Sequence, residues 1–232
     1  MKVSVIIPVR DGAPYVASAI ESVLAQNKPS AELLVIDDGS KDETASIVSR
    51  FSSRGVRLIQ QPPSGGAAAR NEGVKLARHE LLAFLDADDL WSSTKLEQQC
   101  AELQSDPTLD MVFGYVRQFI SPDLEPAKRA RLRCPEGSAR SPHIGTMLVR
   151  RHSFQRVGLF ETTWSIGEFL AWYARAQLLG LREKMIPTVL LERRLHRTNQ
   201  GVLKRSERGD YVRVIKKILD GRREAEAKLS SL

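Results

Sequence analysis

The 232-residue sequence has few cysteines and no long hydrophobic run. Its two cysteines, Cys100 and Cys134, fit no metal-ligand spacing and give no disulfide framework, so we expect a reducing cytoplasmic compartment. The apolar run near the N-terminus, "VSVIIPV", has seven residues and holds a proline, which makes it too short for a signal peptide or a membrane span. No later segment reaches the length of a span, so we expect a soluble protein or one peripheral to the inner face of the membrane.

Several catalytic motifs are also absent. The sequence has no G-x-S-x-G nucleophile elbow, no H-E-x-x-H pair and no Cys/His cluster, which argues against serine hydrolases and zinc hydrolases. The loop "SGGAAARN" has neither the G-x-G-x-x-G spacing of a dinucleotide site nor the lysine of a Walker A motif. Its glycines are typical of a plain loop or of a backbone that approaches a bound phosphate.

The sequence does carry an excess of positive charge, +7 in total. Such an excess favours contact with an anionic partner, which could be nucleic acid, an acidic membrane surface or a phosphorylated substrate. Residues 201–232 hold nine Lys/Arg against five Asp/Glu and so supply +4 of the total, which leaves the body weakly basic. No RNA- or DNA-reading motif is present, so we expect no nucleic-acid partner.

The first hundred residues alternate between short apolar strands and helical segments. Four strand-then-helix units predict an α/β fold whose open, mostly parallel sheet has helices on both faces. In such a sheet, ligands bind beyond the carboxyl ends of the strands. The predicted strands are 3–9, 33–36, 56–61 and 80–89, and the predicted helices are 15–26, 44–51, one within 62–78, and 93–103.

Beyond residue 110 the pattern loosens. Residues 121–142 are rich in proline and basic residues, which predicts a long loop. A helix at 211–219 is amphipathic, with an apolar stripe of Tyr211, Ile215, Ile218 and Leu219. The other predicted elements are strands at 111–115, 146–151 and 188–196, a short helix within 152–160, and a helix at 168–179.

Carboxylates follow three of the first four strands. They are Asp11, then Asp37 and Asp38, then Asp86 and Asp88. Because the carboxyl ends of parallel strands meet at one edge of a sheet, this recurrence is the strongest functional signal in the residues themselves. Adjacent residues in a strand face opposite ways, so only one of the pair at 37 and 38 reaches a shared ligand easily. For Asp37 and Asp38, the sequence favours neither of two interpretations, a polar turn or a contact with a ligand.

The "DAD" sequence at 86–88 is the best candidate for a metal site. Asp86 and Asp88 flank Ala87, so in an extended segment their side chains point the same way. Two converging carboxylates form a hard-oxygen site for Mg²⁺ or Mn²⁺, whose remaining positions substrate phosphates commonly fill. A polar loop that caps the next helix is the alternative. Asp89 is interpreted as an ordinary loop acid.

Single histidines and acids elsewhere carry weaker signals. Of His79, His143, His152 and His196, only His196 stands out, because it follows the apolar strand "TVLL". Each of the others is interpreted as a packed or surface residue. Glu168 opens a predicted helix, where a first-turn acid is favoured by the helix dipole, and a catalytic role is the alternative.

Four stretches, in this order and with these gaps, closely resemble glycosyltransferase family 2, the inverting enzymes of the GT-A fold. They are "VSVIIPVRDGAPYVASAIESVLAQ", "LLVIDDGSKDET", "GGAAARNEGVKLA" and "LLAFLDADD". The similarity is strong to about residue 115 and weaker to about 200. It implies a Rossmann-like sheet with an acceptor-side subdomain, divided into a nucleotide-sugar-binding half (1–115), an acceptor-binding half (116–200) and a C-terminal helical tail (201–232).

The resemblance also implies an activity and donor-binding residues. The expected reaction moves a sugar from a nucleotide diphosphate sugar, usually a UDP-sugar, to an acceptor. Asp38 is expected to hold the nucleotide base, together with the segment Pro8, Val9, Arg10 and Asp11. Arg70 matches the arginine of the family's "ARN" segment, where it either contacts phosphate or braces the loop.

The metal site is likewise implied by the resemblance. Asp86-Ala87-Asp88 is similar to the family's DxD motif, with Asp88 as the direct ligand of Mn²⁺ or Mg²⁺. Asp86 is expected to reach the ribose or the metal's waters. His196 matches a late histidine that often contacts the metal or the diphosphate. A divalent cation in this position stabilises the negative charge that develops on the departing diphosphate.

The base that takes the acceptor's proton is expected in an acidic motif at the start of a helix. Many members of the family read Glu-Asp there, with another acid two residues further on, whereas this sequence has Glu168, Phe169 and then Ala171. Glu168 is therefore the predicted base. The alternative is a catalytically weakened protein of the same fold that binds a nucleotide sugar as a scaffold or sensor.

The acceptor is not specified by the sequence. A peptide, a glycan and a lipid-linked carrier all stay open. The helix at 211–219 could pack on the core, pair two subunits into a homodimer or lie on an anionic membrane, and the first two are favoured because its stripe is short.

Overall fold

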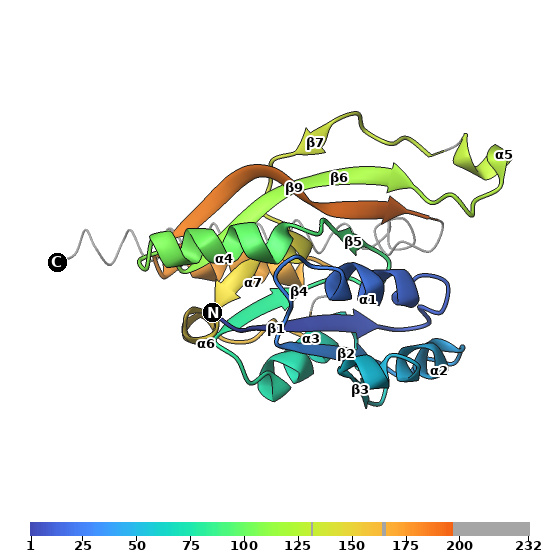
Figure 1. The fold of residues 1–232 in the computed structure, drawn as a ribbon, viewed down its shortest axis with the longest axis horizontal. Coiled ribbons are helices and arrows are strands. Elements are labelled where there is room, and N and C mark those ends of the chain that lie inside the picture. Colours follow the sequence, from blue (N-terminus) through green and yellow to red (C-terminus); the bar gives the residue numbers. More distant parts are fainter. Residues whose placement is uncertain (131, 164–165, 197–232) are drawn as a thin grey trace.

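A computed structural model of the protein describes residues 1–130, 132–163 and 166–196. Within these ranges the chain forms one curled sheet with helices on both faces, as predicted (Figure 1). The predicted helix at 211–219 and the whole tail lie outside the described residues. No helix in the described part of the chain is both long and apolar enough to cross a membrane.

The N-terminal half supplies four strands and the segments that connect them. Its elements are β1 (Val3–Val9), α1 (Val16–Leu24), β2 (Glu32–Asp37), α2 (Thr44–Ser49), η1 (Ser52–Arg54), β3 (Val56–Gln60), α3 (Gly66–Leu76) and β4 (Leu81–Phe84). The strands are parallel in the order β3-β2-β1-β4. Every residue of β1 and β2 is buried, because helices cover both faces of the sheet.

The second half continues the same sheet. Its elements are β5 (Leu90–Trp91), α4 (Lys95–Ser105), β6 (Met111–Ile120), α5 (Pro126–Arg129), β7 (Ser138–Ala139), η2 (Ile144–Thr146), β8 (Leu148–Arg150), α6 (Arg151–Val157), α7 (Glu168–Leu178) and β9 (Glu183–Leu195). The long strands β6 and β9 pair in parallel and run side by side in Figure 1. Each antiparallel pair involves β5, β7 or β8.

Alternate residues of β1 point to opposite faces of the sheet and enter two separate cores. Val5 and Ile7 belong to the core that contains α1, α2 and α4, whereas Ile6 belongs to the one that contains α3, α6 and α7. Gly73 permits the close approach of α3, because a Cβ there would lie 2.4 Å from Cγ2 of Ile6. Burial on both faces fixes the register of β1, and with it the position of the residues that follow.

The structure corrects several predicted elements. β6 continues to Ile120 instead of ending at residue 115, because it pairs with β9 along its length. The predicted loop at 121–142 contains α5 and β7, and β7 pairs with β6. β4 ends at Phe84, so residues 86–89 lie in the turn beyond the strand rather than in it. The two-residue strand β5 was not predicted, since so short a strand has no periodicity to detect.

A charged side chain lies inside this fold. Lys95 is fully buried at the start of α4, where Nζ donates a 2.7 Å hydrogen bond to Oε1 of Gln99 and lies 4.2 Å from the ring centroid of Trp91. Gln99 also donates through Nε2 to the carbonyls of Val112 and Thr146, at 2.7 Å each. Burial lowers the pKa of Lys95 to about 7.

This burial predicts a pH-dependent stability. The pKa of Lys95 is lower in the folded chain than its ordinary value of 10.5, so between pH 7 and 10 the unfolded chain binds more protons and the free energy of unfolding rises with pH. The slope is at most about 1.4 kcal/mol per pH unit. Urea unfolding of Lys95→Met at pH 7 and pH 9 should show this rise reduced, whereas the exposed Lys75→Met should retain it. An equal rise in both variants would refute the assignment.

Candidate functional site

The carboxyl ends of β1, β2 and β4 bring the predicted acids to one edge of the sheet. β1 pairs with β2 on one side and with β4 on the other, all in parallel. The segments that follow these strands carry Asp11, Asp38, Asp86 and Asp88. We call this region the acid edge. The meeting of strand ends that the sequence predicted is therefore present in the fold.

The loop after β1 is locked to the loop after β2. Three consecutive backbone N–H groups donate to side-chain oxygens of the second loop: Asp11 to Ser40 at 2.9 Å, Gly12 to Thr44 at 2.9 Å and Ala13 to Asp42 at 3.0 Å. The backbone N–H of Lys41 donates in return to Oδ1 of Asp11 at 2.7 Å. Asp11 has a φ of 49°, an uncommon value for a residue other than glycine. These hydrogen bonds thus fix the backbone at Asp11, the end of the predicted donor-binding segment 8–11.

Asp38 anchors the loop that leads into α3. Its side chain is buried, and Oδ1 accepts from the side chain of Gln61 and the backbone N–H of Ser64, while Oδ2 accepts from the backbone N–H of Gly65, all at 2.8 Å. Asp37 makes a polar turn instead, where Oδ1 accepts from the backbone N–H of Ser40. A carboxylate can accept about four hydrogen bonds, so the predicted contact of Asp38 with a nucleotide base needs a remaining acceptor position.

Arg70 of α3 bridges the two halves of the chain. One guanidinium nitrogen contacts Oδ1 of Asp86 at 2.6 Å, and the other contacts Oε1 of Glu168 at 2.8 Å. The Arg70 side chain is 9% exposed, and its Nε has no hydrogen-bond partner among the described residues. Burial is the largest single effect and opposes ionisation of Asp86, but the charge and hydrogen bond of Arg70, together with the electrostatic effects of His143 and Arg193, outweigh it and hold the pKa of that carboxyl below its usual value.

Asp88 and His196 meet at the acid edge, as the metal prediction requires. Oδ2 of Asp88 lies 2.8 Å from Nε2 of His196, which follows the end of β9. The His196 ring lies 4.7 Å from the ring of Tyr15, centroid to centroid. In the described part of the chain, no group of three or more His, Cys, Asp or Glu side chains could hold a metal. A carboxylate and an imidazole still suit Mn²⁺ or Mg²⁺ when substrate phosphates and water supply the other ligands.

Asp89 points into the protein. It is 3% exposed, and Oδ1 accepts a 2.8 Å hydrogen bond from the backbone N–H of Arg194. Burial raises its pKa well above the usual value, and the neighbouring charges of Asp88 and Asp86 raise it further. Asp89 therefore connects the turn after β4 to β9. The sequence predicted an ordinary loop acid, whereas the side chain is buried and makes a structural hydrogen bond.

The sequence prediction missed Arg194. Its guanidinium carbon lies 4.8 Å from the ring centroids of both Tyr15 and Phe119, and its Nε donates to the backbone carbonyl of Asp88. It thereby supports the turn that carries Asp88. The basic run "RRLH" at the end of a predicted strand was the only signal for it, and that run does not reveal which strand lies beside it.

Glu168 lies at the first position of α7, after Gly167 with a φ of 90°. Oε1 is held by Arg70, whereas Oε2 has no hydrogen-bond partner among residues 1–130, 132–163 and 166–196. Phe169 packs at 6.0 Å from the ring of Tyr173, and Ala171 is buried. Trp172 belongs to the core and the partly buried Phe169 and Tyr173 pack against it, and Glu168 is the only carboxylate of this motif.

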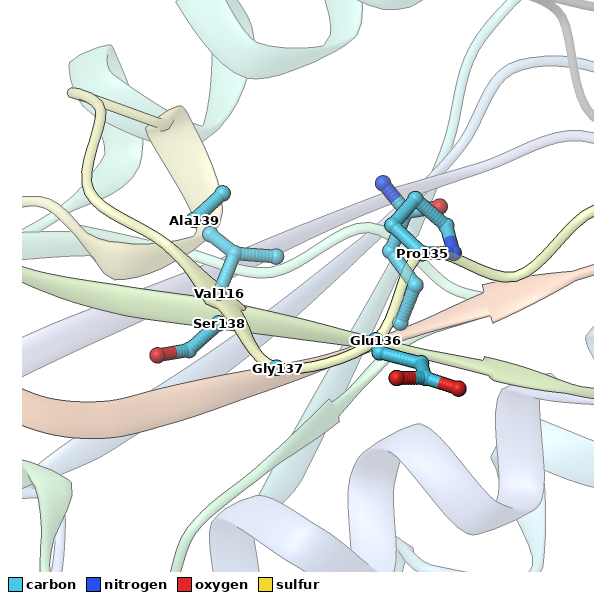
Figure 2. A pocket seen from close by; sticks show the side chains of 7 residues that line it. Val116, Pro135, Glu136, Gly137, Ser138 and Ala139 are labelled. Atoms are coloured by element: carbon cyan, nitrogen blue, oxygen red, sulfur yellow. The ribbon is translucent and has the colours of Figure 1, made fainter.

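A separate cavity of about 130 Å³ lies under β7, away from these residues. Figure 2 shows the segment 135–139 passing over β6, with Val116 and Pro135 in its lining. None of the candidate site residues lines it. Pockets for small-molecule ligands usually span about 300–1,000 Å³, so this cavity is too small for a nucleotide sugar.

The chain is similar to known glycosyltransferases. Residues 4–164 match the family model described as glycosyl transferase family 2. A glycosyltransferase of Bacillus subtilis, EpsJ, is 30% identical over 175 residues, which cover 68% of this chain and 50% of EpsJ. The Escherichia coli enzyme WfgD, named a UDP-Glc:alpha-D-GlcNAc-diphosphoundecaprenol beta-1,3-glucosyltransferase, is 42% identical over 129 residues, which cover 52% of this chain and 51% of WfgD.

Solved structures give a likeness in fold. TarS residues 1–349 of S. aureus in complex with UDP has a TM-score of 0.70 at 21% identity, covering 94% of this chain and 64% of that one. The mannosyltransferase PcManGT of Pyrobaculum calidifontis, in complex with GDP-Man and Mn²⁺, has a TM-score of 0.72 at 21% identity with the same coverage. The chain spans about half the length, or less, of the first curated relatives it matches.

The Arg70 bridge predicts a loss of stability on its removal. Arg70→Met should leave the carboxylates of Asp86 and Glu168 without their counter-charge and lower the free energy of unfolding by about 1–3 kcal/mol, measured by urea denaturation. The matched control is Arg54→Met, which removes an ion pair of similar length, 2.6 Å to Glu21, between half-exposed side chains. That change should cost less than about 1 kcal/mol. Equal losses in the two variants would contradict a special role for the bridge.

Proposed function

Because this chain belongs to glycosyl transferase family 2 and has the GT-A fold, we propose that it is a metal-dependent, inverting glycosyltransferase. It moves a sugar from a nucleotide diphosphate sugar to an acceptor nucleophile. The observation that carries the proposal is the Arg70 bridge, which holds Glu168 of the second half beside Asp86 of the first. A reaction between a bound donor and an incoming acceptor needs groups from both halves at one place.

The donor we propose is a UDP-sugar. The name of WfgD gives it a UDP-sugar donor, and TarS has been crystallised with UDP, whereas the structure of PcManGT is a complex with GDP-Man. The base would lie against residues 8–11 and Asp38. The rigid contacts between the loops after β1 and β2 favour a preformed site there, because the backbone loses little freedom when a ligand binds.

Asp88 and His196 would hold Mn²⁺ or Mg²⁺, and Asp86 lies beside them. The bound cation would supply stabilisation of the negative charge on the departing diphosphate. Arg70 engages one oxygen of Asp86 and helps to hold the pKa of that carboxyl below its usual value, so Asp86 stays ionised. Asp89 takes no part, because its side chain is buried against β9.

Glu168 would act as the general base. Arg70 fixes the carboxylate through Oε1 and leaves Oε2 to accept the acceptor's proton. As the proton leaves, the acceptor attacks the anomeric carbon from the face opposite the diphosphate, and the configuration inverts. The acceptor class stays open among a peptide, a glycan and a lipid-linked carrier. A lipid-linked acceptor, such as the one in the name of WfgD, would require a peripheral membrane position.

The proposed base can be tested with Glu168→Gln, in which an amide oxygen can still accept from Arg70. Release of UDP from a panel of UDP-sugars with Mn²⁺ should fall by about 10²–10⁴-fold, because a general base contributes that much to the rate. The dissociation constant for UDP, measured by calorimetry, should change less than about threefold. Glu72→Gln, at the surface, is the control and should retain the full rate.

Two outcomes of this experiment would contradict the proposal. An unchanged rate in Glu168→Gln would remove the base assignment. Tight UDP-sugar binding by the unmodified protein, with no turnover across acceptors, would favour the scaffold alternative. The replacement of the motif's other acids by Phe169 and the buried Ala171 is the observation that favours that alternative.

The metal assignment predicts a separate effect. Asp88→Asn should abolish the tightening of UDP binding that Mn²⁺ produces, because a neutral amide is a much poorer ligand for a hard cation. Calorimetric titrations of UDP with and without Mn²⁺ measure this difference. Asp106→Asn, which changes an exposed carboxylate, is the control. An Mn²⁺ effect of the same size in Asp88→Asn as in the unmodified protein would rule out Asp88 as a ligand.

A further inference from the structure

His143 precedes the short η2 turn and caps it. Its Nδ1 accepts a 3.0 Å hydrogen bond from the backbone N–H of Gly145. An acceptor nitrogen carries no proton, so in the neutral ring the proton is on Nε2. Ser and Thr are two of the usual caps, and their single hydroxyl would leave no second polar atom beyond the cap. A histidine in this position has a second polar atom, Nε2, and the cap does not explain what that atom binds.

The Nε2–H group of His143 has no acceptor in the described part of the chain. The ring is partly buried, and burial lowers its pKa to about 4, with Arg193 and Arg70 lowering it further against the opposing charge of Asp86. The imidazole is therefore neutral near pH 7. It presents a single directed hydrogen-bond donor rather than a charge.

His143 lies close to the acid edge. Asp86, Arg193, Arg70 and Asp88 all act electrostatically on His143. The packing of η2 agrees with this, because β8 directly after it pairs with β4, which leads to Asp86, and Gly145 contacts Trp91 of β5 and Leu191 of β9. The ring therefore lies near the turn that carries Asp86 and Asp88. This is where the diphosphate of a donor would lie if Asp88 holds its cation.

The segment that carries His143 is firmly held. The carbonyl of Gly145 accepts a 2.8 Å hydrogen bond from Nε1 of Trp91. A Cβ on Gly145 would lie 2.8 Å from Cδ2 of Leu191 and 3.2 Å from Nδ1 of His143, so the backbone packs closely against β9 and against the ring itself. The orientation of the imidazole is therefore set before any ligand arrives.

We propose that Nε2–H of His143 donates a hydrogen bond to a phosphate oxygen of the donor's diphosphate. The inference rests on the proposed function and adds a diphosphate contact to it. Negative charge grows on this group as the glycosidic bond breaks, and a fixed donor stabilises that charge without having to reorganise. A neutral N–H also leaves the charge balance between the acids and the cation unchanged.

The test uses two variants that separate the capping hydrogen bond to Gly145 from the proposed hydrogen bond to the phosphate. His143→Asn retains a good capping oxygen for Gly145 but has no donor at the reach of Nε2. His143→Gln places an amide N–H further out, near the reach of the ring. Calorimetry with UDP and with uridine, both with Mn²⁺, should show UDP binding about tenfold weaker in His143→Asn, with partial recovery in His143→Gln. Binding of uridine should be unchanged in both variants.

Each other result overturns the inference in a recognisable way. Wild-type UDP affinity in His143→Asn, with an unchanged melting temperature, would mean that His143 is only a cap. Equal weakening of uridine and UDP would mean that the change acts on the base site. A loss seen with a UDP-sugar but not with UDP would place the contact on the sugar. If the unmodified protein bound neither UDP nor any UDP-sugar with Mn²⁺, the proposed function itself would fail, and this contact with it.

Discussion

The candidate site depends on one guanidinium that lies between two carboxylates. Asp86 belongs to the first half of the chain and Glu168 to the second, and without Arg70 their like charges would repel in a partly buried space. A planar guanidinium with a short contact to each carboxylate fixes direction as well as charge. The ion pairs of Arg70 therefore fix the position of the turn after β4 relative to the first turn of α7. A ligand that binds here does not have to bring the two turns together.

Arg70 can form this bridge because of how α3 packs. Gly73 lets α3 lie directly on Ile6 of the central strand β1, and at the N-terminal end of the helix Gly66 leaves room for the arginine. A Cβ on Gly66 would lie 3.3 Å from a terminal nitrogen of Arg70. The same strand β1 fixes the registers of β2 and β4 on its two sides, so the acids and the arginine are placed by one core.

The sequence predicts the first half of this arrangement well and the second half poorly, for a physical reason. The strands before Asp11, Asp38 and Asp86 are buried on both faces, so their apolar runs are unambiguous and their ends are easy to place. Arg194 acquires its neighbours through β9, which pairs with β6 and β5 across long stretches of chain, and His143 acquires its neighbours through the pairing of β8 with β4. No local sequence pattern predicts these pairings. Arg70 falls between these cases. The sequence indicated that this arginine belongs to the site, but it did not predict that its partners are Asp86 and Glu168.

The three acids of the turn after β4 also show why a count of carboxylates does not define a metal site. The chain itself supplies a different partner for each acid. Arg70 lowers the pKa of Asp86, burial raises that of Asp89, and Asp88 meets His196. Neighbours from three distant segments therefore give the three acids different environments. For a cation at this edge, Asp86 is already paired with Arg70, and the side chain of Asp89 is turned into the protein. A cation bound at this edge would therefore lie on the side of Asp88.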